Sequence, residues 1–209
     1  MFLNESRREY TKFSLDKQHA CDNPFAQFED WFQSAIKHAV FEHNAMLLST
    51  VSNGRPSSRV VLLKQFDTTG FTFFTNYNSK KALEIDANPN VAITFYWPNI
   101  ERQIRIEGKA EKTTKEASEA YFSTRPRDSQ LAAWASHQSN PIQDRAALDA
   151  AMDAIAKEFP NTIPLPEFWG GYKVVPDYFE FWQGRENRYH DRIVYAQEGD
   201  NWAMSRISP

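Results

Sequence analysis

The sequence predicts a mainly β fold, in which an antiparallel barrel of Greek-key type carries peripheral helices. Apolar runs of strand length follow one another between turn residues. Helical patterns interrupt these runs irregularly, so a doubly wound parallel sheet, which needs regular alternation, is not expected. We expect a polar N-terminal arm over residues 1–22 and one domain over residues 23–209, long enough to bury a core without disulfides or metal.

The first helix is predicted from its start signals. Asn23 supplies an N-cap side chain, and Pro24 is a first-turn residue whose fixed φ suits a helix. Apolar residues then recur at helical spacing between Phe25 and Val40. The pattern therefore predicts a helix that ends near His43.

A β-hairpin follows the first helix. Its strands are predicted at residues 45–51 and 57–66, and the Asn53-Gly54 pair favours a tight turn because both residues tolerate positive φ. The further elements expected are a strand at residues 71–75, a helix at 79–88, paired strands at 91–96 and 101–111, helices at 114–123, 129–136 and 145–159, and short strands over 169–206 with turns near Pro176, Gly184 and Gly199.

Two of these elements indicate which side faces the core. Alternation in the strand at 101–111 places one set of residues inward and the other outward: Arg102, Ile104, Ile106 and Gly108 against Glu101, Gln103, Arg105 and Glu107. The helix at 145–159 carries an apolar stripe that we expect to be buried: Leu148, Met152, Ile155 and Phe159.

Composition excludes several classes of function. A formal net charge of −3 argues against a general nucleic-acid binder. No apolar run reaches bilayer length, so no membrane association is expected. Cys21 is the single cysteine and the chain begins without an apolar signal core, which favours a reducing, cytoplasmic setting. Aromatic residues reach 14%, a composition suited to packing flat rings against one another or against a planar ligand.

The motifs that are absent limit how a ligand could be bound. Only seven glycines occur, and none of the glycine-rich loops that cradle nucleotide phosphates is present. A bound phosphate must therefore be held by separate side chains. The five histidines show no pair at metal-binding spacing, so no metal site is expected.

Residues 59–64 are the first candidate for ligand contact. Arg59 and Lys64 bracket apolar residues and lie five positions apart, so a regular strand would aim them at opposite faces, roughly 16 Å apart. Such a strand could serve two separate anions. The alternative is a core strand with charged ends.

The second candidate is the segment 121–129. Tyr121, Arg125 and Ser129 follow at four-residue spacing around a helix break, so a guanidinium and two hydroxyls could converge on one phosphate. The alternative is an arginine that compensates the dipole at a helix C-terminus.

The third candidate is the segment 182–192. If it is extended, Arg188, His190 and Arg192 share one face, and such a concentration of positive charge calls for an anionic ligand or for carboxylates. The alternative is the solvated face of a strand. Two further pairs, Lys80-Lys81 and Gln138-Ser139, indicate nothing by themselves.

Taken in order, these segments resemble the pyridoxamine 5′-phosphate oxidase family along almost the whole chain. The segments that carry the resemblance are Arg7-Arg8-Glu9-Tyr10, residues 59–64, Phe74-Thr75-Asn76, Ser79-Lys80-Lys81, Glu101-Arg102-Gln103, and residues 121–129, 134–139, 168–171, 180–184 and 188–192. Each segment is weak alone, and their common order makes the resemblance specific.

The resemblance implies an FMN-binding split β-barrel that works as a homodimer, with flavin sites built from both subunits at the interface. It implies oxidation of pyridoxamine 5′-phosphate or pyridoxine 5′-phosphate to pyridoxal 5′-phosphate, with O2 reduced to H2O2, a step of vitamin B6 salvage. The C-terminal strands would serve dimerisation and the active site, and residues 1–22 would form a lid over the substrate.

The resemblance also assigns residues to roles. The FMN contacts it implies are Arg59, Val60, Val61, Leu62, Leu63, Lys64, Phe74, Thr75, Lys80, Lys81, Gln103, Gln138, Ser139, Trp182 and Arg192. The substrate contacts it implies are Arg7, Arg8, Glu9, Tyr10, Lys64, Tyr121, Arg125, Ser129, Arg188, Tyr189 and His190. Arg188 and His190 would be the catalytic residues, acting by position and charge.

Three residues depart from the family pattern, and two other functions stay open. Lys80 replaces a common arginine, Phe74 a common tyrosine and Tyr189 a usual leucine. The first alternative is a flavin oxidase of phenazine biosynthesis, which would act on an unphosphorylated tricyclic substrate. The second is a non-catalytic protein that binds flavin or pyridoxal phosphate.

Overall fold

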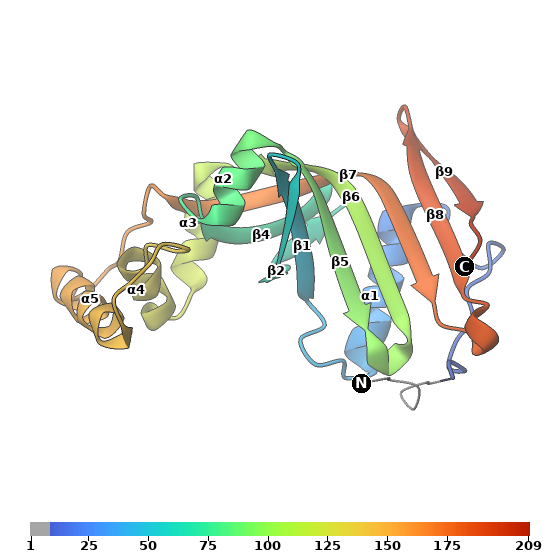
Figure 1. Cartoon of the computed structure of the whole chain (residues 1–209), viewed down its shortest axis with the longest axis horizontal. Helices are drawn as coiled ribbons and strands as arrows, with labels where there is room; N and C mark the ends of the chain where they lie inside the picture. The colour runs from blue at the N-terminus through green and yellow to red at the C-terminus, as the bar shows by residue number, and fades with distance from the viewer. Residues whose placement is uncertain (1–8) are drawn as a thin grey trace.

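A computed structural model describes residues 9–209, and Arg7 and Arg8 lie outside them. Antiparallel strands dominate, with helices at the periphery (Figure 1). The helices are α1 (Pro24–Lys37), α2 (Lys80–Ala87), α3 (Lys115–Thr124), α4 (Arg127–Ala135) and α5 (Arg145–Glu158), with short 3-10 turns η2 (Pro98–Ile100) and η3 (Glu186–Arg188). The strands are β1 (Ala45–Ser52), β2 (Arg55–Leu62), β3 (Gln65–Asp67), β4 (Gly70–Asn76), β5 (Asn90–Trp97), β6 (Arg102–Lys112), β7 (Trp169–Gln183), β8 (Asp191–Glu198) and β9 (Asn201–Arg206).

The strands form one nine-stranded sheet in the order β2-β1-β5-β6-β7-β4-β3. On its other edge, β7 changes partner along its length: its first part pairs with β4 and its last part with β8, which in turn pairs with β9. The sheet therefore divides at β7. Figure 1 places α3–α5 and the β8–β9 hairpin at opposite ends of the molecule.

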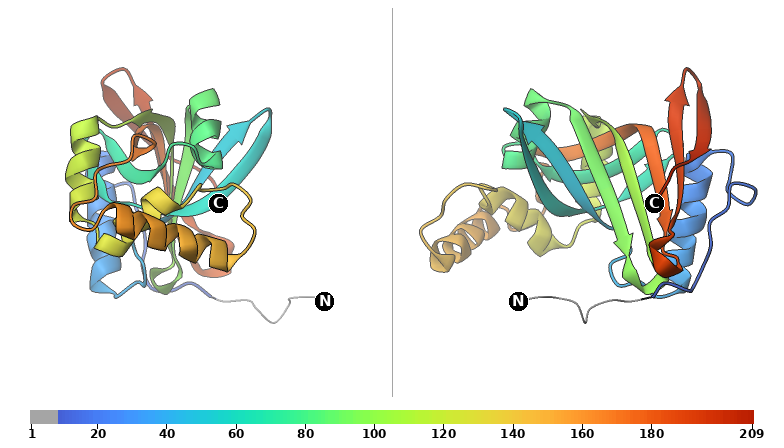
Figure 2. Two further views of the ribbon diagram at one scale, coloured as in Figure 1. Left: turned by 90° about the vertical axis from the view of Figure 1, so that its left-hand side faces the viewer. Right: turned by 45° about the vertical axis from the view of Figure 1, so that its right-hand side comes forward.

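Helix α1 lies against one face of the sheet (Figure 2). The core lies between them, and aromatic rings fill it. Phe28 of α1 contacts the rings of Phe66, Phe71 and Phe95 at centroid distances of 4.8 to 5.2 Å. Edge-to-face pairs of this kind add stability beyond the area they bury. A second, smaller cluster packs α3–α5 against Trp169 at the start of β7.

The first helix begins as predicted and ends earlier than predicted. The Asn23 side chain accepts a hydrogen bond from the Phe25 N–H, as an N-cap should. The helix ends at Lys37 because Ala39 adopts a left-handed conformation (φ 50°) and the Val40 N–H bonds to the Ala35 carbonyl. This is a Schellman end, formed here without the glycine that usually marks one.

The first hairpin is confirmed, but its second strand is shorter than predicted. Asn53 (φ 49°) and Gly54 (φ 73°) form the tight turn. The strand predicted over 57–66 divides into β2 and β3, because the chain stops pairing with β1 at Leu62 and the Lys64 N–H bonds to Thr72 of β4. Lys64 therefore lies in the bend between two strands.

The C-terminal strands differ most from the prediction. The prediction of a turn near Pro176 is wrong, because β7 continues through Pro176 to Gln183. Pro176 lies between the stretches that pair with β4 and with β8, so its missing N–H costs no ladder bond on that edge. It also lies at a register shift against Gly108, where an added Cβ would come within 2.1 Å of the Val175 carbonyl. The turn at Gly199 (φ 61°) is confirmed.

The two predictions about core-facing sides had different outcomes. Alternation in β6 is confirmed, with Arg102, Ile104 and Ile106 buried. Glu101, which was predicted to face outward, is also buried. It lies in the turn before β6 with a left-handed backbone conformation, so the alternation of the strand does not apply to it. The stripe on α5 is only half-buried, and no residue of that helix is fully buried.

Candidate active site

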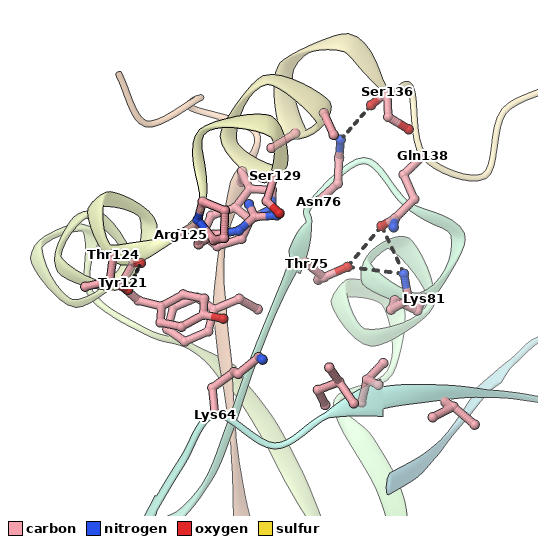
Figure 3. A pocket seen from close by; sticks show the side chains of 18 residues that line it. Lys64, Thr75, Asn76, Lys81, Tyr121, Thr124, Arg125, Ser129, Ser136 and Gln138 are labelled. Atoms are coloured by element: carbon pink, nitrogen blue, oxygen red, sulfur yellow. Dashed lines mark hydrogen bonds between the residues drawn. The ribbon is translucent and has the colours of Figure 1, made fainter. Parts of the chain in front are cut away.

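A cavity of about 660 Å³ opens between the β2–β3 bend, β4 and the helices α3 and α4 (Figure 3). Most of the residues predicted for the cofactor and for the substrate phosphate meet here. The predicted residues that line it are Val60, Val61, Leu62, Lys64, Phe74, Thr75, Lys81, Tyr121, Arg125, Ser129 and Gln138. Other lining residues were not predicted: Asn76, Thr124, Pro126, Ala132, Ala133, Ser136 and Trp169. Leu63 is buried in the core instead.

The cavity is positively charged. Lys64, Lys81 and Arg125 line it, and within the described chain no aspartate or glutamate does. Like charges that share a partly desolvated space repel one another, so the arrangement favours a bound anion. The cations lie in two groups: Arg125 and Lys64 beside Tyr121, and Lys81 beside Thr75 (Figure 3).

Of these three cations, Arg125 is the one whose burial has the clearest cost in free energy. Its guanidinium lies 4.7 Å from the Trp169 ring centroid, and its Nη1 atom is buried without a hydrogen-bond partner among residues 9–209. Burial lowers the pKa of this guanidinium. A buried donor that lacks a partner costs free energy, and an anion in the cavity would remove that cost.

The other predicted phosphate ligands surround Arg125. Tyr121 stacks on Phe74 at 4.0 Å, and the Lys64 ammonium lies 6.0 Å from the Tyr121 ring centroid. Ser129 lies in the first turn of α4, whose N-terminus has no side-chain cap. Four side chains from the β2–β3 bend, α3 and α4 thus converge on one part of the cavity.

Lys81 holds the second positively charged part of the cavity. Its ammonium donates to Thr75 Oγ1 at 3.2 Å, to Ser79 Oγ at 3.2 Å and to Gln138 Oε1 at 3.0 Å, all neutral oxygens. Burial is the main cause that lowers the pKa of Lys81, and the positive charge of nearby Arg59 lowers it further. The neighbouring residues Lys80 and Ser139 line a smaller pocket of about 300 Å³ on the adjoining side of α2.

Arg59 does not line the cavity. Its Nη2 atom lies 2.8 Å from the Glu84 carboxylate, and its Nη1 donates to Thr50 Oγ1 at 2.6 Å. The anion that Arg59 binds in this structure is therefore the Glu84 carboxylate of α2. This contact ties β2 to the helix that carries Lys80 and Lys81, so Arg59 supports that helix, and its predicted contact with the cofactor stays a prediction.

Replacing Arg59 with alanine is expected to lower the free energy of unfolding by about 2 kcal/mol, because Glu84 loses a charged hydrogen bond. Burial raises the pKa of Glu84, but hydrogen bonds from Thr50 and Arg59 outweigh it and leave the pKa lowered. The stabilisation is thus present above the ordinary glutamate pKa and lost as pH falls through the folded value. Urea unfolding at pH 7 and at about pH 4 measures both effects. Equal urea midpoints for the wild type and Arg59→Ala at pH 7 would contradict the supporting role of Arg59.

The remaining predicted residues lie at the far end of the sheet. His190 and Trp182 have ring centroids 4.6 Å apart, and Tyr10 of the arm lies edge-on to both, at 5.9 and 5.7 Å. Gln103 pairs with Trp182 across the strands, and Glu9 accepts a hydrogen bond from the Asn187 N–H. These residues form a second cluster, which we call the C-terminal cluster.

The prediction that Arg188, His190 and Arg192 share one strand face is wrong. Residues 186–188 form a 3-10 turn in which Asn187 and Arg188 both have positive φ, and only Arg192 lies on β8. Arg188 and Tyr189 are exposed. Burial lowers the pKa of His190, as does the positive charge of Arg188 beside it, and both effects favour the neutral imidazole.

Arg192 has the carboxylate partner that its charge requires. Glu180 is almost fully buried, and its Oε1 lies 2.8 Å from Arg192 Nε, while Oε2 lies 2.9 Å from Arg105. The hydrogen bond that Arg192 donates to Glu180 raises the pKa of Arg192. The sequence signal for this contact is an acidic residue, Glu180, within an otherwise apolar stretch of strand.

The cavity and the C-terminal cluster are separate within one chain, because none of the cluster residues lines the cavity. Trp169 lines the cavity at the start of β7, and Trp182 lies near the end of the same strand. Extended backbone rises ~3.3 Å per residue, so about 40 Å of strand separates them. A ligand that needs both clusters must lie between two copies of the chain.

Family models match most of this sequence. The family described as "Pyridoxamine 5'-phosphate oxidase" matches residues 32–158. The "Pyridoxine 5'-phosphate oxidase C-terminal dimerisation region" matches residues 169–209. The second match begins at the first residue of β7 and includes the C-terminal cluster residues Trp182 and His190.

Similar proteins extend the match over the full length. A pyridoxine/pyridoxamine 5′-phosphate oxidase of Haemophilus influenzae is 50% identical over 100% of both chains. One of Rubrobacter xylanophilus is 51% identical over 97% of this chain and 94% of its own. Among solved structures, PhzG from Burkholderia lata, in complex with tetrahydrophenazine-1-carboxylic acid, has a TM-score of 0.88 at 28% identity, covering 93% of this chain and 98% of its own. An FMN-binding protein of Nostoc punctiforme has the same fold, with a TM-score of 0.71 at 19% identity over 94% and 100%.

Proposed function

This chain belongs to the pyridoxamine 5′-phosphate oxidase family, and we propose that it is an FMN-dependent oxidase that converts pyridoxamine 5′-phosphate or pyridoxine 5′-phosphate to pyridoxal 5′-phosphate, with O2 reduced to H2O2. The observation that carries the proposal is the cavity, in which Arg125 and Lys64 lie beside aromatic rings and Lys81 lies apart from them beside Thr75. No carboxylate among residues 9–209 lines this space. Two phosphorylated ligands, the cofactor and the substrate, would balance both groups.

The residues of the cavity fit FMN. Lys81 is partly desolvated, and its hydrogen-bond partners among the described residues are all neutral, so a phosphate would complete its coordination. Lys80 and Ser139 lie next in sequence to Lys81 and Gln138 and could bind further phosphate oxygens. The outer side of β2 offers exposed apolar surface for a flat ring, with Val60 65% exposed. When bound, FMN supplies the two-electron acceptor that the oxidation needs.

Lys64, Tyr121, Arg125 and Ser129 would hold the substrate phosphate, with Arg125 as its main charged ligand. The substrate ring would then project from the cavity toward the C-terminal cluster. Arg188 and His190 of the partner subunit would orient that ring and exclude water from it, while Tyr10 and Trp182 of the partner subunit would hold His190 of the partner subunit in place. These residues fix distance and angle, which is the protein's share of such a reaction.

A homodimer follows from the same placement. The dimerisation family model matches β7–β9, which carry the C-terminal cluster. The outer face of the β1–β2 hairpin exposes apolar side chains beside the cavity, as a subunit interface requires: Leu47, Val51, Val60 and Leu62. We therefore propose one FMN site at each end of a two-fold interface, with residues 23–209 as the barrel domain and residues 1–22 as the lid.

Departures from the family pattern leave the proposed contacts intact. Phe74 keeps the stacking on Tyr121 and Trp169 that a tyrosine ring would make. Lys80 keeps a positive charge at the start of α2, although it cannot form a bidentate pair with phosphate. Tyr189 is 81% exposed, so its ring is free to contact a partner subunit or ligand.

An oxidase of phenazine biosynthesis is the weaker candidate. The likeness to PhzG is close in fold but lower in identity than the likeness to the pyridoxine/pyridoxamine 5′-phosphate oxidases. An unphosphorylated substrate would leave Arg125 Nη1 buried and without a partner in the part of the chain that the structure describes. A phosphorylated substrate is therefore favoured. No helix within residues 9–209 is long and apolar enough to cross a membrane. A cytoplasmic location, which the single cysteine favours, belongs to the proposal.

We expect the purified protein with FMN to be yellow and to bleach anaerobically when pyridoxine 5′-phosphate is added, with the colour restored by air. The absorbance of the flavin near its visible maximum measures both steps. Pyridoxine without phosphate is the control, and it should bleach the protein far more slowly because Arg125 and Lys64 find no anion. A protein that binds FMN but never bleaches would leave only the non-catalytic alternative.

A further inference from the structure

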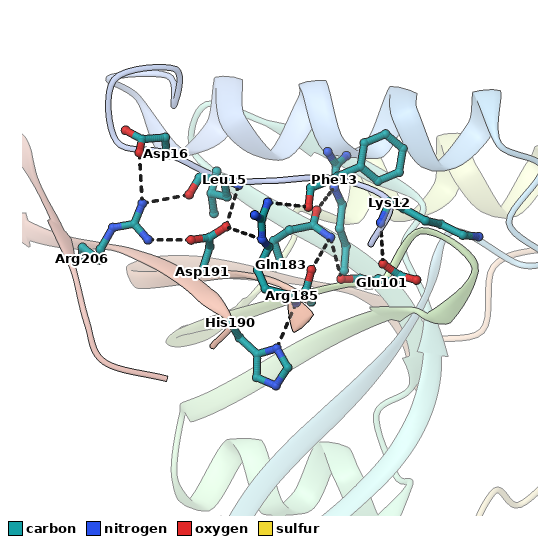
Figure 4. Close-up of polar contacts among 12 residues, drawn as sticks. Lys12, Phe13, Leu15, Asp16, Glu101, Gln183, Arg185, His190, Asp191 and Arg206 are labelled. Atoms are coloured by element: carbon teal, nitrogen blue, oxygen red, sulfur yellow. Dashed lines mark hydrogen bonds and ion pairs between the residues drawn. The ribbon is translucent and has the colours of Figure 1, made fainter. Parts of the chain in front are cut away.

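Residues 12–16, which we call the strap, cross the far end of the sheet just after Tyr10 (Figure 4). The strap lies outside the strand ladders, and side chains from distant elements bind its backbone. The Lys12 N–H donates to Glu101 Oε2 at 3.0 Å, and the Leu15 N–H donates to Asp191 Oδ2 at 3.1 Å. Because buried backbone groups need partners, these side chains decide where the strap lies.

Two arginines bind the carbonyl groups of the same strap. Arg185 donates to the Phe13 carbonyl at 3.2 Å, and Arg206 donates to the Leu15 carbonyl at 2.9 Å. The Asp191 carboxylate lies 2.7 Å from Arg206 Nη1 and 3.7 Å from Arg185 Nε. Asp191 thus touches one strap N–H itself and orients both guanidiniums that hold the strap carbonyls.

The same network reaches the imidazole of His190. The backbone N–H of Arg185 donates a hydrogen bond to His190 Nδ1 at 3.1 Å. Nδ1 is therefore an acceptor, and the neutral ring carries its proton on Nε2. Asp191 follows His190 directly in the chain. The strap in turn leads to Tyr10, whose ring packs on His190 and fills the space that a Cβ at Gly184 would occupy, 2.7 Å from Tyr10 Cγ.

We propose that Asp191 is a positioning residue: by seating the strap and Arg185, it holds the His190 ring in one orientation and one tautomer. The proposal rests on the proposed function, since it takes His190 to face the substrate. Asp191 itself contacts strap and arginines and needs no contact with any ligand. Its side chain is 18% exposed, so its loss would not create an empty apolar cavity.

The test is Asp191→Asn in the full-length protein with FMN bound. The amide keeps the size of the side chain and loses the charge that orients Arg185 and Arg206. We expect kcat to fall about tenfold, with FMN affinity and dimer mass unchanged, because a misoriented catalytic group slows the reaction without weakening binding. Asp149→Asn, which breaks an exposed aspartate–arginine pair on α5, is the matched control and should change nothing.

Two readouts need no turnover, so they separate this proposal from the proposed function. Nitrogen NMR of the histidine rings should show a defined Nε2–H tautomer for His190 in the wild type and a mixture in Asp191→Asn. Trypsin should cleave the arm near Lys12 and Lys17 faster in the variant. Arg206→Met, which acts on His190 only through Asp191 and the strap, should reproduce both changes.

The contrary results are equally clear. A kcat within twofold of the wild type together with an unchanged His190 tautomer would overturn the proposal. Loss of FMN or of the dimer in Asp191→Asn would assign Asp191 to general stability instead, and would also overturn it. A third result is a wild type that does not oxidise pyridoxine 5′-phosphate while its His190 tautomer still depends on Asp191. That result would contradict the proposed function and would still support the role of Asp191 in positioning His190.

Discussion

Replacing Arg125 with alanine is expected to raise the KM for pyridoxine 5′-phosphate about 100-fold, while FMN remains bound with its usual affinity. Arg125 is the cation of the cavity whose buried Nη1 atom has no hydrogen-bond partner among residues 9–209, so the phosphate would gain a charged hydrogen bond there. A hundredfold loss corresponds to about 2.7 kcal/mol, within the range for hydrogen bonds to charged groups. Steady-state kinetics give the KM, and quenching of flavin fluorescence gives the FMN dissociation constant.

Arg127→Ala is the matched control for this prediction. Arg127 lies two residues further on and is exposed, and its guanidinium donates to the Phe159 and Asn161 carbonyls, outside the cavity. Its loss should leave the substrate KM unchanged. If Arg125→Ala weakened FMN and substrate equally, the assignment of Lys81 and Arg125 to two different phosphates would be wrong.

Local sequence signals predicted the elements whose structure depends on local chemistry. Asn23 caps the first helix and Asn53-Gly54 makes the first turn, because each effect involves only a few neighbouring residues. The end of α1 was missed because its left-handed residue is Ala39, and the usual signal is glycine. The course of β7 through Pro176 depends on which strands lie beside it, and no local pattern contains that information.

The candidate site divides in the same way. The spacing of Tyr121, Arg125 and Ser129 indicated a phosphate site, and the cavity brings them together with Lys64. The sequence could not show that Arg59 binds Glu84, because the fold decides which of several carboxylates an arginine meets. Nor could it show that the C-terminal cluster lies at the opposite end of β7, since distance along a strand appears only once its length is known.

Mixed dimers of two inactive variants should recover activity if each active site combines the cavity of one subunit with the C-terminal cluster of the other. Arg125→Ala removes a charged residue of the cavity. Arg188→Ala removes a charged residue of the turn that leads into His190 of the C-terminal cluster, and this turn does not line the cavity. Each homodimer carries two damaged sites, and we expect at most a few per cent of wild-type activity at low substrate from either. In the mixed dimer, two-fold symmetry places both defects in one site and leaves the other intact.

The mixed dimer, purified through a different affinity tag on each subunit, should therefore show about half of the wild-type activity, because one of its two sites is whole. Lys64→Ala paired with Arg125→Ala is the control, since both changes lie in the cavity and every site of that mixed dimer carries one of them. It should stay as slow as its parents. If the first mixed dimer also failed to recover, Arg125 and Arg188 would not serve complementary halves of a shared site, and the position of Arg188 on the far side of the molecule would exclude it from the reaction.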